Sequence, residues 1–294
     1  MYAVLNLTKD HDAKQNGFMS SNIGHQEDDF SVICELASNF GFSGVNIDLL
    51  NNNYSILEIR NLLEKYKLIP VSFHCTVEFS GSEDSFNRSL KQFIEQAKIA
   101  SQIGCNLALK YIPPFSSNLN FNEHFKLYSR RVGSLKAILV DYNVKIAFEF
   151  IGPRETRLKS KYDFIHTIDG LRSLIASSDT YKYVGFKLDV HHWQHSGASV
   201  LDINHLDQEY ILYIELNDGL KGFNSFSIPE FRRTLPLETG VNDIKGFLSS
   251  IYKKGYRGPV AIEPWNSFIA SLPIEEAIKL TKLSLDRCFS LIRK

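Results

Sequence analysis

The stretch Val144-Lys145-Ile146-Ala147-Phe148-Glu149 is an apolar run of strand length that ends in a carboxylate. Side chains alternate along a strand, so Ala147 and Glu149 share one face while Phe148 takes the other. Six further runs end in phase with this one, each with a last residue that shares a face with the residue two positions earlier. The pairs are Asn46 and Asp48, Ser72 and His74, Ala108 and Lys110, Lys187 and Asp189, Tyr213 and Glu215, and Ala261 and Glu263.

Apolar runs of this kind recur along the whole chain and alternate with stretches of helical spacing. Eight strands are predicted, at 2–7, 44–48, 69–74, 106–111, 144–149, 183–189, 211–215 and 258–263. Helical spacing is clear at 54–66, 83–103, 121–142 and 274–292. With no Pro/Gly/Ser-rich linker between them, these elements predict an α/β fold, a single (β/α)8 TIM barrel over residues 1–294. A doubly wound sheet is the alternative, but no Gly-rich phosphate-binding turn follows any strand.

Composition excludes several classes of protein. The 294 residues carry 33 Lys plus Arg and 33 Asp plus Glu, so the net charge of zero argues against a nucleic-acid partner. No window approaches the roughly 18–20 apolar residues of a membrane helix. The first residues contain no basic leader, so no signal peptide is expected. The four cysteines are far apart and form no CxxC motif, which favours free thiols and a cytoplasmic location.

In a barrel, the shared face of the strand ends points at the axis, and the carboxyl-terminal rim is where barrel enzymes keep their chemistry. The predicted rim holds Asp48, Glu149, Asp189, Glu215 and Glu263, together with Lys110 and Lys187. Converging carboxylates repel one another, so either some are protonated or a cation offsets them. A divalent metal is the simplest solution, and oxygen ligands suit Mg or Mn.

Four segments carry a resemblance to a known family. They are Phe148-Glu149-Phe150-Ile151-Gly152-Pro153, Leu188-Asp189-Val190-His191-His192-Trp193-Gln194-His195-Ser196-Gly197, Ile214-Glu215-Leu216-Asn217-Asp218 and Gly255-Tyr256-Arg257-Gly258-Pro259-Val260-Ala261-Ile262-Glu263-Pro264. By their order and spacing, the chain resembles the xylose isomerase-like TIM-barrel superfamily of sugar phosphate isomerases and epimerases. That superfamily also includes inosose dehydratases, 3-dehydroshikimate dehydratases and the AP endonuclease branch.

The resemblance implies one divalent metal held by Glu149, Asp189, Glu215 and Glu263. Glu215 falls where relatives usually carry a His, three residues before Asp218. A set of four carboxylates favours Mn or Mg over Zn. The substitution also leaves open a weaker or lost metal site.

The resemblance further implies that His192 contacts substrate oxygens, with His191 and His195 less clearly placed. Candidate substrate contacts at the rim are His74 and Lys110. Trp193 either forms a wall of the pocket or packs on the loops. Lys187, two residues deeper than Asp189, is either a substrate contact or a structural ion-pair partner of the acidic residues. The arginines of the long loops, Arg154, Arg232 and Arg233, are expected at solvated positions, and one that reached the mouth of the barrel could bind a phosphate or a carboxylate.

These residues predict a metal-dependent isomerase or epimerase of a small sugar or related polyhydroxylated carbonyl compound. It would act through an enediolate, with Glu149 and Glu263 as the acid/base residues. A dehydratase acting on a cyclitol or a dehydroshikimate-like ketone would use the same enolate and stays open. So does a non-catalytic sugar-binding barrel with a degraded metal site. An AP endonuclease-like nuclease is disfavoured by the net charge and by Glu215. A homo-oligomer is possible, since relatives are often dimers or tetramers.

Overall fold

Eight parallel strands close into a barrel in this computed structural model, which describes residues 1–8, 23–180, 182–223 and 232–292. The order around the barrel is β1-β10-β9-β8-β6-β4-β3-β2. The strands are β1 (Tyr2–Leu5), β2 (Gly44–Asn46), β3 (Ile69–His74), β4 (Leu107–Ile112), β6 (Lys145–Phe150), β8 (Val184–Asp189), β9 (Ile211–Leu216) and β10 (Pro259–Ile262). The predicted (β/α)8 barrel is confirmed, and each predicted strand is present within a few residues.

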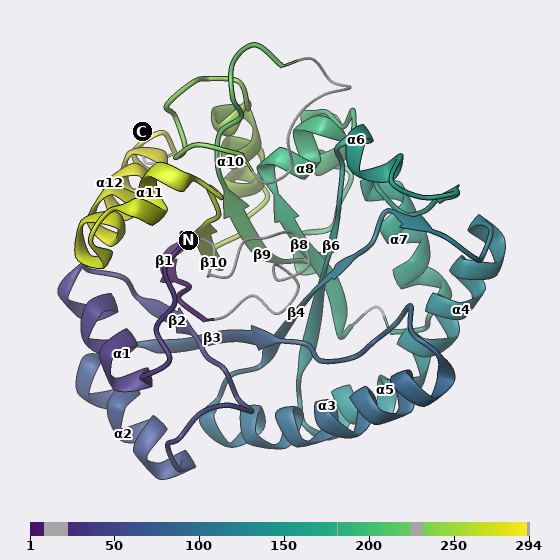
Figure 1. Cartoon of the computed structure of the whole chain (residues 1–294), viewed down its shortest axis with the longest axis horizontal. Coiled ribbons are helices and arrows are strands. Elements are labelled where there is room, and N and C mark those ends of the chain that lie inside the picture. The colour runs from purple at the N-terminus through teal and green to yellow at the C-terminus, as the bar shows by residue number, and fades with distance from the viewer. Residues whose placement is uncertain (9–22, 181, 224–231, 293–294) are drawn as a thin grey trace.

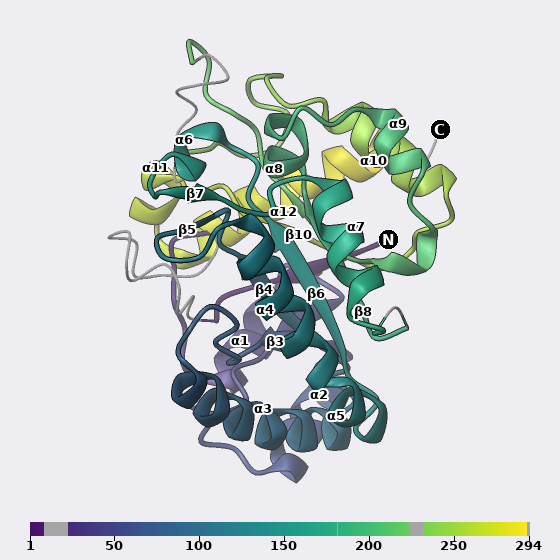
Figure 2. The same ribbon diagram turned by 90° about the vertical axis from the view of Figure 1, so that its right-hand side faces the viewer.

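Helices form the outer layer around the barrel (Figures 1 and 2). The longer ones are α1 (Phe30–Asn39), α2 (Ile56–Tyr66), α3 (Glu83–Ile103), α4 (Phe121–Ser134), α5 (Lys136–Asp141), α7 (Ile168–Ser177), α10 (Ile244–Lys253) and α12 (Ile274–Ser290). Local signals set their ends. The Ser82 side chain accepts from the Ser85 N–H at the start of α3, and Gly104 ends that helix at a φ of 76°. The stretch predicted as one helix over 121–142 is divided into α4 and α5 at Leu135.

Short elements lie in the loops that follow the strands. Helices α6 (Arg154–Arg157), α8 (Val190–His195), α9 (Val200–Asn204) and α11 (Ser267–Ser271) are of this kind. Strands β5 (Phe115–Ser116) and β7 (Tyr162–Asp163) pair antiparallel and join the loops after β4 and β6. This small sheet was not predicted. The sheet connects the loop after β4 to the loop after β6, which are separate segments of the sequence.

Two apolar layers hold the barrel. The larger lies between strands and helices and includes Phe148 and Phe150. The smaller fills the barrel interior and consists of Val4, Val71, Ala147, Tyr213 and Ala261. Ala147, Tyr213 and Ala261 each precede by two residues a carboxylate of the predicted rim. The interior layer therefore lies directly below the rim residues, on the same face of the strands.

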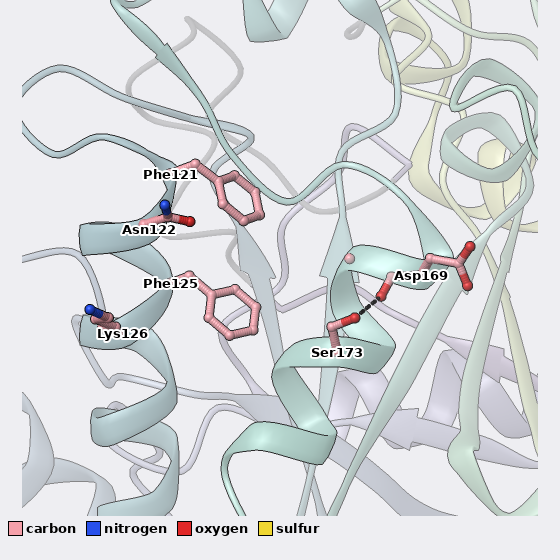
Figure 3. Close-up of a pocket in the computed structure, with 7 residues that line it drawn as sticks. Phe121, Asn122, Phe125, Lys126, Asp169 and Ser173 are labelled. Carbon is pink, nitrogen blue, oxygen red and sulfur yellow. Dashed lines mark hydrogen bonds between the residues drawn. The ribbon is translucent and has the colours of Figure 1, made fainter.

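A groove of about 500 Å³ opens in the helical layer between α4 and α7, with Phe121 and Phe125 turned toward α7 (Figure 3). It lies among outer helices and not at the axis of the barrel. Among the described residues, no helix is long and apolar enough to cross a membrane. The four cysteines are buried thiols and form no disulfide, as expected.

Candidate active site

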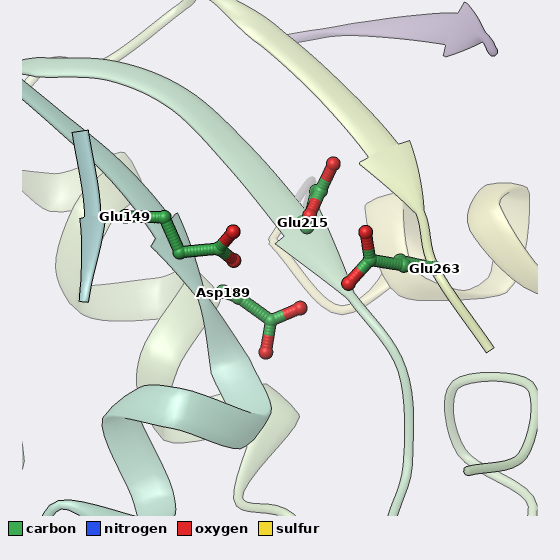
Figure 4. Close-up of side chains that lie close together, drawn as sticks. All are labelled: Glu149, Asp189, Glu215 and Glu263. Carbon is green, nitrogen blue, oxygen red and sulfur yellow. The ribbon is translucent and has the colours of Figure 1, made fainter. Parts of the chain in front are cut away.

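Four carboxylates from adjacent strands meet at the carboxyl-terminal end of the barrel (Figure 4). Glu149 belongs to β6, Asp189 to β8 and Glu215 to β9, and Glu263 directly follows β10. One oxygen from each lies within 4.8 Å of the others, and all four residues are buried. Parallel pairing sets Asp189 opposite Glu215 and Glu215 opposite Ala261, so the strand register brings the acids together.

Lys187 lies among these carboxylates. Its Nζ is 2.7 Å from Glu215 Oε2, 3.0 Å from Glu149 Oε2 and 3.8 Å from Glu263 Oε1. Burial by itself would lower the pKa of Lys187, but the surrounding carboxylates raise that pKa well above its ordinary value. Lys187 is therefore an ammonium ion at neutral pH. Of the two roles left open by the sequence, it has at least the ion-pairing one.

Arg233 lies inside the cluster. It was expected at a solvated loop position, yet its side chain is 1% exposed. Its Nη1 lies 2.9 Å from Glu263 Oε2 and 3.2 Å from Asp189 Oδ2. The loop is bent inward where the Arg233 N–H donates to the Pro264 carbonyl and Thr234 pairs with Asp218. Arg154 and Arg232 are exposed, as expected.

Negative charge remains costly in the cluster even with two cations present. Burial raises the pKa of Glu149 to about 8, with Lys187 opposing that rise and Glu263 adding to it. Burial also raises the pKa of Asp189 and of Glu215. Asp189 is fixed by hydrogen bonds from the His191 and His192 backbone N–H groups and from Asn217 Nδ2.

The exposed fractions divide the buried cluster into a slightly exposed part and a sealed part. The side chains of Lys187, Glu149 and Glu263 are 11%, 7% and 7% exposed. Those of Glu215 and Asp189 are 1% and 0% exposed. The first three groups therefore keep a small exposed fraction, whereas the last two are sealed from solvent.

The three histidines after β8 are all affected by burial. His192 Nδ1 accepts from the Gly152 N–H at 3.4 Å, and its Nε2 lies 3.4 Å from Arg233 Nη2 and 3.6 Å from Glu149 Oε1. Burial, with Arg233 as the next cause, lowers the pKa of His192 and of His191 well below the usual range. The same causes lower the pKa of His195 to about 4. His192 thus borders the cluster as a neutral imidazole.

The remaining predicted residues are more dispersed. Lys110 is buried on β4, and half-buried His74 ends β3. Trp193 lies in the helical layer, where its ring packs on Phe247 and its indole N–H donates to the Ser199 carbonyl. This position does not support the predicted contact with substrate. Asp48 does not join the acidic cluster, because its carboxylate accepts from the Leu50 and Asn51 N–H groups of its own turn.

By ligand type and mutual distance, the four carboxylates could hold a metal ion. Divalent ions bind carboxylate oxygens at about 2.0–2.6 Å. Yet each of the four already contacts a cation of the chain, either Lys187, Arg233 or, for Glu263, both. An ion at the centre would require Lys187 Nζ to leave. As arranged here, the residues do not fit a resident metal.

A closed barrel with an acidic cluster at its carboxyl-terminal rim has its charged side chains where barrel enzymes have their active sites. Residues 34–284 match the xylose isomerase-like TIM barrel family, and the chain belongs to that family. The chain is similar to an inosose isomerase of Halalkalibacterium halodurans, at 22% identity over 237 residues, which are 78% of each protein.

Two solved structures share the fold. The IOLI protein with a bound zinc atom superposes with a TM-score of 0.79 at 19% identity, covering 99% of this chain and 98% of that one. A D-psicose 3-epimerase determined in the presence of D-fructose gives a TM-score of 0.73 at 12% identity, with both chains fully covered.

Proposed function

We propose that this protein is an isomerase or epimerase of a small sugar or related polyhydroxylated carbonyl compound, with Glu149 and Glu263 as its acid/base residues. One observation carries the proposal: two of the four buried carboxylates, Glu149 and Glu263, keep a small exposed fraction of 7%, whereas the other two are sealed from solvent. Glu149 and Glu263 come from β6 and from the end of β10, with β8 and β9 between them. They can therefore contact a substrate from two sides.

The reaction requires a proton to leave the carbon next to a carbonyl. One carboxylate takes that proton, and the electron pair of the broken C–H bond forms an enediolate with the carbonyl group. The other glutamic acid returns a proton, either to the opposite face of the same carbon or to the former carbonyl carbon beside it. In the second case the proton of the neighbouring hydroxyl group also passes to the former carbonyl oxygen, so that the carbonyl group moves by one carbon. The first outcome is epimerisation and the second is isomerisation. A pKa near 8 for Glu149 suits a group that both accepts and donates protons near neutral pH.

The names of the relatives support the substrate class. The inosose isomerase and the D-psicose 3-epimerase are both named for reactions at carbonyl-bearing polyols. Asp189 and Glu215 would then orient Lys187 and Arg233, and His192 would orient the substrate. If a divalent ion displaced Lys187, the four oxygen ligands would favour Mn or Mg over Zn, although a relative binds zinc. No step above depends on such an ion.

The test is solvent exchange. Purified protein is incubated in D₂O with a panel of ketohexoses and inososes, and proton NMR follows loss of the signal at the carbon next to the carbonyl. We expect exchange with at least one compound. Glu149→Gln and Glu263→Gln should each slow it by about 10²–10⁴-fold, the usual contribution of a general acid or base.

Glu155→Gln, which changes an exposed glutamate in the loop after β6, serves as the matched control and should exchange at the wild-type rate. Loss of water to give an unsaturated ketone would replace this proposal with the dehydratase. Binding of a panel compound without exchange would indicate the sugar-binding barrel.

A further inference from the structure

The position of Lys187 has a consequence beyond the class of reaction. Its Nζ lies within 3.8 Å of oxygens from three of the four carboxylates that together could hold a metal ion. Arg233 Nη1 bridges the fourth, Asp189, to Glu263. The chain thus supplies its own positive charge at the place where several carboxylates would otherwise require an external cation.

Lys187 is fixed there by the fold. It lies on β8 two residues before Asp189, so both side chains point to the barrel interior. Its register partner is Tyr213, the residue of the interior layer that lies two positions before Glu215. Glu215 is sealed from solvent and has its Oε2 2.7 Å from Nζ, the shortest of the three contacts. A carboxylate at position 215 is a stronger partner for an ammonium ion than a neutral imidazole, because its hydrogen bond is charge-assisted on both sides.

Lys187 also has access to the substrate. Its side chain is the most exposed of the cluster, at 11%, and the two glutamates beside it are the proposed acid/base pair. An enediolate carries negative charge on the former carbonyl oxygen. A positive group aimed at that oxygen stabilises the transition state more than the ground state, which is the condition for catalysis.

We propose that the Lys187 ammonium is the resident cation of this active site, in the place that a divalent ion would take, and that it hydrogen-bonds the substrate carbonyl oxygen during proton transfer. The second half of this statement rests on the proposed function. The electron balance is complete without an oxidant or a reductant. The C–H pair moves into a C=C bond, the C=O π pair moves to oxygen, and the ammonium stabilises that oxyanion.

The first experiment concerns metal binding alone. EDTA-treated full-length protein is titrated with Mn²⁺ while free Mn²⁺ is counted by electron paramagnetic resonance, and with Zn²⁺ by calorimetry. We expect no one-to-one binding to the wild type or to Lys145→Met, which removes an exposed lysine at the opposite end of β6. Lys187→Met leaves the carboxylates without their central cation and should bind one Mn²⁺ at least about 100-fold more tightly.

The double variant Lys187→Met/Glu215→His should bind one ion with its preference shifted from Mn²⁺ toward Zn²⁺. The proposal is overturned if the wild type binds one Mn²⁺ or Zn²⁺ per chain at micromolar concentrations and Glu215→Ala weakens that binding. This wild-type result decides the matter even if a Lys187 variant fails to fold, which circular dichroism would reveal.

The second experiment repeats the deuterium exchange in EDTA. Exchange that persists in the wild type and in Lys145→Met, but falls at least about 100-fold in Lys187→Met, supports both proposals. Exchange that appears only after Mn²⁺ or Zn²⁺ is added keeps the proposed function and overturns the role of Lys187. If no panel compound exchanges under either condition, the proposed function and the substrate contact both fail. The titration still decides whether Lys187 is the resident cation.

Discussion

On the β2–β3 side of the barrel interior, Ser72 Oγ donates to Asn46 Oδ1 at 2.9 Å, and Tyr213 reaches the same oxygen from β9 at 3.4 Å. On the side formed by β6, β8, β9 and β10, four carboxylates surround Lys187 and Arg233. Both sides are buried polar clusters in one barrel. The first consists of neutral groups that satisfy one another, whereas the second concentrates charge and is only partly balanced.

The difference indicates which side of the barrel has a structural role and which side has a role in the reaction. A neutral hydrogen-bonded cluster contributes modestly to stability and has no dependence on pH. A buried charged cluster costs desolvation free energy that its ion pairs only partly return. A protein keeps such a cluster where function requires it, and the stability of each side should respond differently to substitution.

The largest effect is expected from removing a cation of the charged side. Arg233→Met leaves Asp189 and Glu263 without their shared guanidinium, so the free energy of unfolding should fall by about 3–5 kcal/mol. Arg232→Met, at the exposed neighbouring position, should change it by less than about 0.5 kcal/mol. Urea unfolding of the two variants measures the difference. Equal stability of the two would mean that Arg233 does not support the cluster.

A second prediction uses the pKa of Glu149, which burial raises to about 8. The folded state holds a proton that the unfolded state loses above its own pKa of about 4.5. Wild-type stability is therefore lost as pH rises from 4.5 to 8. Glu149→Gln removes this dependence, so its stability relative to wild type should improve by about 3–4 kcal/mol between pH 5 and pH 8.

Urea unfolding at both pH values measures the effect, with Glu155→Gln as the control that should follow the wild type. A parallel pH dependence of Glu149→Gln and wild type would contradict the raised pKa. A gain in stability that accompanies the expected loss of exchange would show directly that this carboxylate is kept for chemistry at a cost in stability.

The charged side was largely predictable from the sequence, because its geometry follows from the alternation of side chains within each strand and from the register between neighbouring strands. Strand alternation puts Lys187 and Asp189 on one face, and parallel register then brings Glu215 and Glu263 beside them. Arg233 was not predictable in this way. Its position depends on long-range backbone contacts with Pro264 and on the pairing of Thr234 with Asp218. No periodic pattern in a loop encodes such contacts.

Trp193 illustrates a different limit. It lies only four residues after Asp189, so proximity in sequence suggested proximity in space. Helix α8 begins at Val190, and its first turn carries Trp193 outward onto Phe247. The small β5–β7 sheet was missed for the same reason as Arg233, because two-residue strands in loops have no periodicity to read.

His124 is a buried ionisable group that the fold keeps neutral. Its contribution to the pH dependence of stability has the opposite sign to that of Glu149. Its ring stacks on Phe164 at 4.0 Å, and burial lowers its pKa to about 4. The unfolded state gains a proton below about pH 6.5, whereas the folded state does not until about pH 4. Stability is therefore lost as pH falls through this window.

His124→Phe should keep the stacking and remove that loss. The free energy of unfolding of the variant minus that of wild type should therefore be about 2 kcal/mol larger at pH 5 than at pH 7.5. Chemical denaturation at the two pH values measures this. His205→Phe is the control, since His205 is exposed at the end of α9. If the two variants respond alike to pH, burial does not govern the titration of His124.

The smallest effect is expected on the neutral side, where Ser72→Ala removes the hydroxyl that donates to Asn46 Oδ1. Asn46 keeps its contact with Tyr213, so the cost should be about 1 kcal/mol, the net value of one hydrogen bond. The cost should be the same at pH 5 and at pH 8, because no group that titrates between these pH values loses a partner. Deuterium exchange should continue at close to the wild-type rate, since Ser72 lies on β3 and not among the acidic strands. A loss of exchange comparable to that of Glu263→Gln would mean that the neutral side also takes part in the chemistry, and the division of the barrel into scaffold and active side would fail.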